Sequence, residues 1–169
     1  MANIVEFLNE VVNDTDVVSV QSTDVLDDGY IGVLGDLVNG EMDLYKFEKI
    51  NPATKNGAVM VVGSDVYMDS FGSRIGYKDP GKITYPAKRP VRAYRLRVGM
   101  RFKIDKDAID GTCVKGKFVI PKESDYQLTV ADDLSNHTVG LAFVVEDVEN
   151  SIFVGKSVVD AVVVRVDRV

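Results

Sequence analysis

Residues 126–147 read YQLTVADDLSNHTVGLAFVVED, and this stretch decides the fold class. Apolar and polar side chains alternate from Tyr126 to Val130, which is typical of a strand with one buried face. The polar cluster from Asp132 to Asn136 predicts a turn. A second strand is expected from Val139 to Asp147, so the stretch predicts two short strands joined by a turn.

The same pattern continues on both sides of this stretch. A strand is expected at Val158 to Val166, and three more precede the stretch, at Lys115 to Ile120, Arg101 to Ile104 and Val91 to Leu96. Short strands at regular spacing, separated by turn signals, are typical of small barrels and sandwiches. We therefore expect a β-barrel or β-sandwich domain over residues 91–169.

Residues 1–63 predict a second β-containing portion or arm, because apolar runs of strand length alternate there with turn signals such as Asn39-Gly40. The run from Gly29 to Gly35 alternates small and large residues, which indicates a strand with a close backbone approach or a bulge. Residues 4–12 place apolar side chains at helical spacing, so a short helix is favoured there over an extended arm.

Residues 64–90 separate these two portions and show neither the alternation of a strand nor the apolar spacing of a helix. They carry Asp79-Pro80-Gly81, Pro86 and Pro90. Long segments without a pattern are uncommon inside compact domains and are often functional, so we interpret this one as a loop or linker. The expected fold class is mainly β, with minor helix.

Charge is sorted along the chain. Residues 1–50 hold two basic residues against eleven acidic ones, whereas residues 74–106 hold eleven basic against two acidic, within a net charge of −6. Separated acidic and basic surfaces favour contact with copies of the same chain or with an oppositely charged assembly. The acidic isoelectric point, near 4.8, argues against nucleic acid as the main partner.

The basic block alternates cations with apolar residues, so a strand there would present several cations on one face. One interpretation is an ordinary solvated face. The other is a docking strip for an acidic protein surface, since arginine is enriched at interfaces and forms bidentate pairs with carboxylates. The candidate interface residues are Lys88, Arg89, Arg92, Arg95, Arg97 and Arg101.

Motifs for nucleotide and metal binding are incomplete. Gly111 to Lys117 follows the phosphate-binding loop pattern, but Phe118 replaces its hydroxyl residue; Gly155-Lys156-Ser157 lacks the first glycine, because Asn150 stands there. Asp105, Asp107 and Asp110 resemble the start of a calcium loop, but Ile109 and Gly116 occupy ligand positions. One cysteine, Cys113, and one histidine, His137, make no zinc set. We expect no cofactor and no metal.

His137 permits one catalytic set, with Ser135 or Cys113 as the nucleophile and an aspartate such as Asp133. Catalytic triads are recognised by geometry, and a polar turn between strands is also where a solvent-facing histidine is expected. A small β-barrel enzyme or ligand-binding module that uses His137 therefore remains the alternative, and our expectation is a protein that is not an enzyme.

A resemblance adds to this interpretation. The run PVRAYRLRVGMRF at residues 90–102, with DAIDG at 107–111, resembles a segment of small structural proteins of tailed phages and prophages; GDLVNGE at 35–41 and VVGSDVYMD at 61–69 fit the same pattern. The resemblance implies a capsid decoration protein, also called a cement or auxiliary head protein. That class is mostly β, is not enzymatic, binds the outside of the shell and has no cofactor or catalytic residue.

The expected function is thus that of a virion structural protein on the capsid surface, made in the host cytoplasm. Its expected partners are the major capsid protein and copies of itself, as a homo-oligomer on the capsid lattice. A tail or head–tail joining subunit, which would form rings, is the alternative. No signal-peptide pattern and no window of 18 apolar residues occurs, so we expect no membrane partner.

Overall fold

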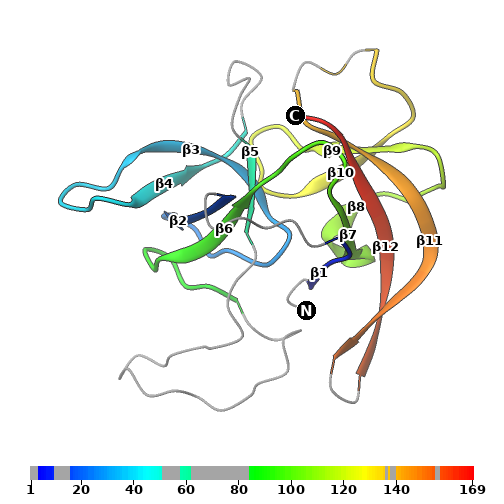
Figure 1. The fold of residues 1–169 in the computed structure, drawn as a ribbon, viewed down its shortest axis with the longest axis horizontal. Helices are drawn as coiled ribbons and strands as arrows, with labels where there is room; N and C mark the ends of the chain where they lie inside the picture. Colours follow the sequence, from blue (N-terminus) through cyan, green and yellow to red (C-terminus); the bar gives the residue numbers. More distant parts are fainter. Residues whose placement is uncertain are drawn as a thin grey trace.

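The computed structural model describes residues 4–9, 16–50, 58–61, 84–135, 137, 140–154 and 157–169. The prediction of a mainly β protein with minor helix is confirmed. Strands dominate both halves of the described chain, and helical structure is limited to short turns such as the 3-10 turn η3, Lys106–Ala108 (Figure 1). No helix in the described part of the chain is long and apolar enough to cross a membrane.

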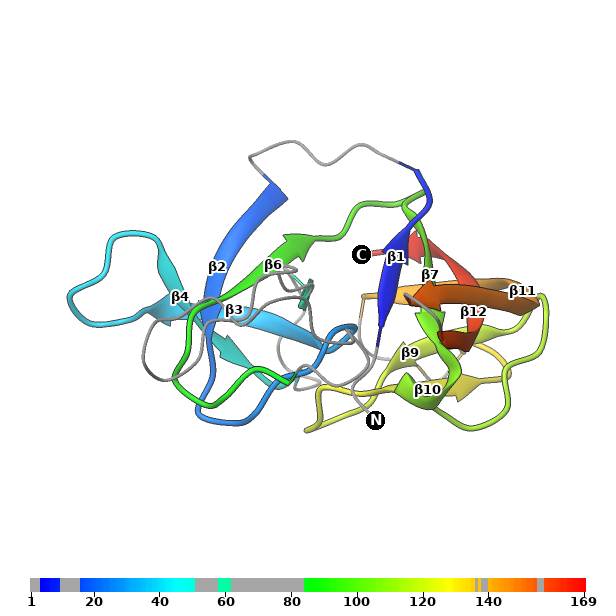
Figure 2. The same cartoon turned by 90° about the horizontal axis from the view of Figure 1, so that it is seen from below.

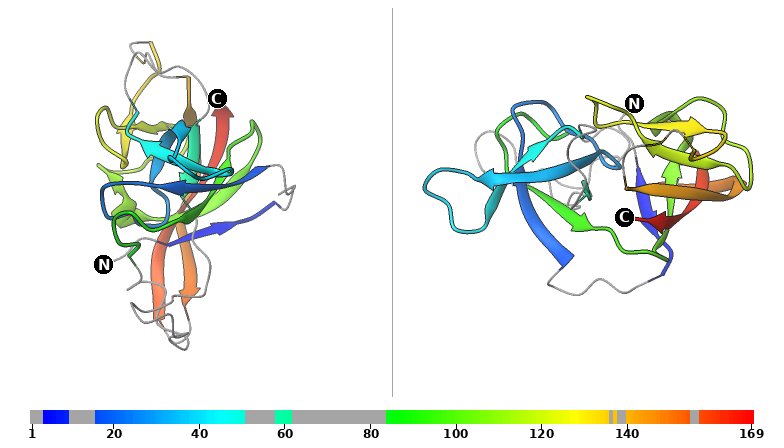
Figure 3. Two further views of the ribbon diagram at one scale, coloured as in Figure 1. Left: turned by 90° about the vertical axis from the view of Figure 1, so that its left-hand side faces the viewer. Right: turned by 90° about the horizontal axis from the view of Figure 1, so that it is seen from above.

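Five strands close into a barrel. They pair in the order β2-β4-β3-β5-β6, and β6 returns to pair with β2 (Figure 3). The β2–β4 pair is parallel and the other four pairs are antiparallel. Closure leaves no free sheet edge. The strands are β2 (Val17–Gln21), β3 (Ile31–Leu37), β4 (Leu44–Glu48), β5 (Ala58–Val61) and β6 (Val91–Arg95).

The remaining strands form one curled sheet of seven, in the order β1-β7-β12-β11-β9-β10-β8. Only η3 separates β7 from β8 along the chain, yet four strands lie between them in the sheet. The sheet must therefore curl to bring β8 back towards β7 (Figure 2). The strands are β1 (Val5–Phe7), β7 (Arg101–Asp105), β8 (Ile109–Asp110), β9 (Phe118–Pro121), β10 (Leu128–Ala131), β11 (Ala142–Val154) and β12 (Ser157–Arg168).

Strand pairing crosses the expected division of the chain at both ends. β6, expected among the strands of residues 91–169, pairs with β2 and β5 and completes the barrel. β1, expected with residues 1–63, lies at the edge of the curled sheet against β7. The closed barrel is thus built within residues 17–95, and the C-terminal strands form the curled sheet.

The helix favoured for residues 4–12 is wrong where the structure describes them, because Val5–Phe7 is a strand. Its three residues pair in antiparallel register with Phe102 to Ile104 of β7. The Phe7 ring packs against Phe102, with 5.9 Å between ring centroids, and against Tyr94, at 5.3 Å. Cross-strand contacts of aromatic side chains outweigh a helical spacing that covers only about two and a half turns.

The barrel and the curled sheet share their apolar packing. Ile31, Val33 and Met60 of the barrel strands belong to the same buried cluster as Phe102 and Phe143 of the curled sheet. In the other direction, Tyr126 from the β9–β10 connection enters the barrel's own cluster beside Val20 and Phe47. The continuous packing predicts that the two parts unfold together.

The close backbone approach expected between Gly29 and Gly35 is present at Gly32. A Cβ atom on Gly32 would lie 2.5 Å from the ring of Phe47 and 2.7 Å from the carbonyl oxygen of Glu48, so any side chain would force the β3 and β4 strands apart. The pairing of these strands also shifts register between Leu34 and Leu37, where a bulge interrupts the ladder.

Most of the loop expected at residues 64–90 lies outside the described residues. Its last part, residues 84–90, is fastened to the barrel. Tyr85 and Leu26 exchange two backbone hydrogen bonds of 2.7 and 2.9 Å. Lys88 adopts a left-handed backbone conformation, with φ of 61°, while its N–H donates to the carbonyl oxygen of Ser22 at 2.7 Å. These bonds hold the Lys88 backbone beside β2.

Candidate protein interface

The six candidate interface residues do not form one row. β6 ends at Arg95 and β7 begins at Arg101, and a turn with Gly99 at φ of 89° reverses the chain between them. Within β6, Val91 and Ala93 are buried and Arg92 is exposed, so Arg92 lies on the outer face of the barrel. Arg95 is exposed at the end of the same strand.

Arg97 and Arg101 are among the candidate cations that form ion pairs inside the molecule. Arg97 forms an ion pair with Asp16, whose carboxylate is buried. Arg101 Nε donates to Glu146 at 2.7 Å, and the second oxygen of Glu146 accepts from Arg165 Nε at 3.0 Å. Removing the cation from a buried ion pair strongly destabilises the folded protein, because the carboxylate is left buried and unpaired. Arg97 is therefore a structural residue, and reversing its charge would disturb folding as well as any docking.

Sequence reasoning missed one cation that the fold brings to Arg92. Lys46 of β4 lies opposite Gln21 of β2, and Gln21 Nε2 donates to the carbonyl oxygen of Lys88 at 2.6 Å. Arg92 lies opposite Ser19, two residues before Gln21. We call the exposed cations Lys46, Lys88 and Arg92 the basic patch. None of the three forms an ion pair within the described parts of the chain.

The β11–β12 hairpin carries the most exposed aromatic side chain of the described residues. Phe153 is 79% exposed, and it lies directly opposite Val158, which is 58% exposed. β7 pairs with β12 only over Ala161 to Arg165, and β9 pairs with β11 only at Phe143 and Val144. The end of the hairpin thus projects as a two-stranded arm (Figure 1).

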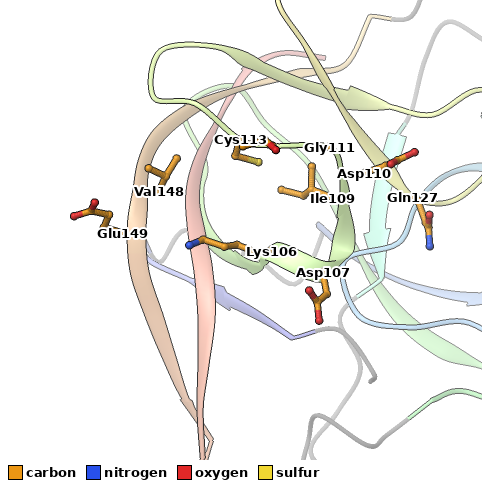
Figure 4. Close-up of a pocket in the computed structure, with 10 residues that line it drawn as sticks. Lys106, Asp107, Ile109, Asp110, Gly111, Cys113, Gln127, Val148 and Glu149 are labelled. Carbon is orange, nitrogen blue, oxygen red and sulfur yellow. The ribbon is translucent and has the colours of Figure 1, made fainter.

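An open cavity of about 870 Å³ lies beside η3 and β8, at one side of the curled sheet (Figure 4). Its lining mixes cations, carboxylates and apolar groups, including Lys106, Asp107, Val148 and Glu149. Cys113 also lines it, and burial raises the pKa of this thiol, which favours the protonated form that is a poor nucleophile.

Two of the three aspartates that resemble a calcium loop have carboxylates that accept hydrogen bonds from other parts of the chain. Asp105 accepts a hydrogen bond of 2.9 Å from the N–H of Asp107 and begins η3, while burial raises the pKa of its carboxyl. Asp110 accepts from Lys122 Nζ at 3.0 Å. Within the described ranges, no group of three or more histidine, cysteine, aspartate or glutamate side chains is placed to hold a metal ion.

His137 and Ser135 have different partners. The His137 Nε2 atom lies 3.1 Å from the carbonyl oxygen of Leu141, and the Ser135 hydroxyl donates to Asp133 within the same turn. Among the described residues, no hydrogen bond joins His137 to Ser135 or Asp133. The first phosphate-loop candidate leads into strand β9, and the second, which lies partly outside the described residues, leads into β12; the motif requires a helix.

Comparison of the chain with models of protein families, with curated proteins and with solved structures finds no match.

Proposed function

We propose that this chain is a virion structural protein that decorates or cements the outside of a tailed-phage capsid through protein–protein contacts. The main structural support for this proposal is the projecting, apolar end of the β11–β12 hairpin. The resemblance of residues 90–111 to phage structural proteins supports the choice of a capsid as the partner. The partners would be the major capsid protein and further copies of this chain, which would be made in the host cytoplasm and bound to the capsid surface.

The hairpin end has one covered face and one open face. Ile152 is buried with Ile4 and Ala161 on the covered face. On the open face Phe153 and Val158 form a cross-strand pair that the described residues leave in solvent. A protruding aromatic and aliphatic pair is suited to an apolar depression on a partner, where such anchors supply much of the binding free energy.

Replacing Phe153 and Val158 together with Ser should weaken binding to the shell by roughly 10-fold to 100-fold. The reason is that burying each apolar side chain contributes about 1.5–3 kcal/mol, of which association recovers only part. The measurement is a competition between variant and wild type for isolated capsomers, because many copies on a lattice would mask a weaker single contact.

A matched control changes two exposed valines elsewhere, Val25 and Val114, to Ser. Both double variants should keep the thermal unfolding midpoint of the wild type, since all four side chains are largely exposed. If the Phe153 and Val158 variant competes for capsomers as well as the control variant does, the hairpin end does not bind the shell and the proposal is contradicted.

A further inference from the structure

The hairpin that joins β3 to β4 ends in a cluster of exposed acidic residues around an exposed apolar one. Met42 is 92% exposed, and the side chains of Asp36, Glu41 and Asp43 around it are also exposed. We call these four residues the acidic tip. The hairpin end projects from the barrel (Figure 2). Its three carboxylates form no ion pair within the residues that the structure describes.

The basic patch complements this tip in charge. Elsewhere the molecule pairs its own charges, as in Lys49 with Asp24, Lys103 with Glu6 and Lys122 with Asp110. The patch cations and the tip carboxylates form no such ion pair within the described chain, so both surfaces stay free to meet opposite charges on another molecule. Beside Arg92 the outer face carries Tyr94 and Val17, which lie opposite each other and are half-buried, with one side of the Tyr94 ring packed against Phe7.

The two surfaces are neighbours on one strand. Met42 lies just before β4 and Lys46 lies within it, four residues later, which corresponds to about 13 Å along an extended chain. Two copies related by a two-fold axis can therefore make the same contact twice, each tip meeting the other copy's patch. A contact made twice in one closed pair satisfies both unpaired surfaces of each copy.

We infer that the acidic tip docks on the basic patch of a second copy of this chain, in a reciprocal dimer. Met42 would pack beside Tyr94, because thioether groups make favourable contacts with aromatic rings, and the tip carboxylates would pair with Lys46, Lys88 and Arg92. The biological role of this dimer contact rests on the proposed function, in which it would join neighbouring copies on a shell. The contact itself needs no shell.

The test exchanges charges between the two surfaces. One variant reverses the tip, with Glu41→Lys and Asp43→Lys; the other reverses the patch, with Lys46→Glu and Arg92→Glu. Each variant alone would place like charges in both contacts, whereas a mixture places opposite charges in both. Sedimentation velocity of purified full-length protein at low salt should show a wild-type dimer, a dissociation constant raised at least about 10-fold for either variant alone, and a restored dimer in the mixture.

The matched control carries Lys106→Glu and Lys115→Glu, two exposed cations away from the patch, and should dimerise like the wild type. High salt should weaken the wild-type dimer, because the Debye length falls to about 3 Å at 1 M. Should a reversed variant fold poorly, a single chain with all four tip and patch substitutions should dimerise again.

A mixture that stays monomeric, a wild type that stays monomeric at low salt, or single-surface variants that dimerise like the control would each overturn the inference. Binding of the same proteins to capsomers is measured separately. A wild type that binds capsomers but does not self-associate contradicts this contact alone, and a wild type that self-associates but does not bind capsomers contradicts the proposed function alone.

Discussion

Replacing Phe102 with Ala is expected to lower the free energy of unfolding by about 3–5 kcal/mol, the range for truncating a large aromatic side chain in a core. Phe102 is fully buried on β7, and its ring packs edge-on against Phe143, with 5.5 Å between centroids, and against Phe7 at 5.9 Å. Truncation would open a cavity where β1, β7 and β11 meet. Urea denaturation, monitored by far-UV circular dichroism, measures the loss in the free energy of unfolding.

The chain offers a matched control in Phe153→Ala, which removes the same atoms from a side chain that is 79% exposed. This control should change the free energy of unfolding by no more than about 0.5 kcal/mol. Equal losses at the two positions would contradict the packing described for the curled sheet.

Replacing Tyr126 with Ala is expected to cost about 3–5 kcal/mol as well, through a different set of contacts. The Tyr126 ring stacks on Phe47 at 5.0 Å and on Tyr30 at 5.8 Å, and its hydroxyl donates to the carbonyl oxygen of Phe47 at 3.2 Å and lies 3.0 Å from Ser22 Oγ. Because Tyr126 comes from the β9–β10 connection, its loss would weaken the packing between the curled sheet and the barrel.

Tyr126→Phe separates the ring from the hydroxyl. It keeps the stacking and loses the hydrogen bonds, so a loss of about 1–2 kcal/mol is expected, close to the value of one buried hydrogen bond. Denaturation of the three proteins under the same conditions gives the comparison. A Tyr126→Ala variant as stable as Tyr126→Phe would show that the ring contributes nothing to joining the two parts.

Local patterns in the sequence predict several elements of this fold. The alternation around Leu128 to Val130 marks β10, and the β-branched run from Val158 to Val166 marks β12, since side-chain period is a property of the strand itself. Gly32 is predictable for the same local reason: small residues in a strand indicate a close neighbour.

Strand partners are not local and could not be predicted in this way. β6 returns to β2 across more than 70 residues of chain, and β1 pairs with β7 instead of with the barrel strands that follow it. Both choices depend on which apolar faces meet after the chain has collapsed, and the period of a strand does not encode its partner.

The candidate interface shows the same limit. Alternation correctly predicts that Arg92 is exposed, but the partner of Arg97 is Asp16, which lies 81 residues earlier. Lys46 belongs to a strongly acidic part of the sequence, and only the parallel β2–β4 pairing brings it to the basic patch. A charge block in sequence is therefore a poor guide to a charged surface when the strands that carry it belong to two sheets.

Cryo-electron microscopy of phage or prophage particles from cells that encode this chain tests the proposed function most directly. We expect density for the barrel and the curled sheet on the outer surface of the shell, with the Phe153 end of the β11–β12 hairpin against the major capsid protein. Particles whose shells carry no such density, or in which the chain is found only at the portal or in the tail, would contradict a role in decorating the capsid.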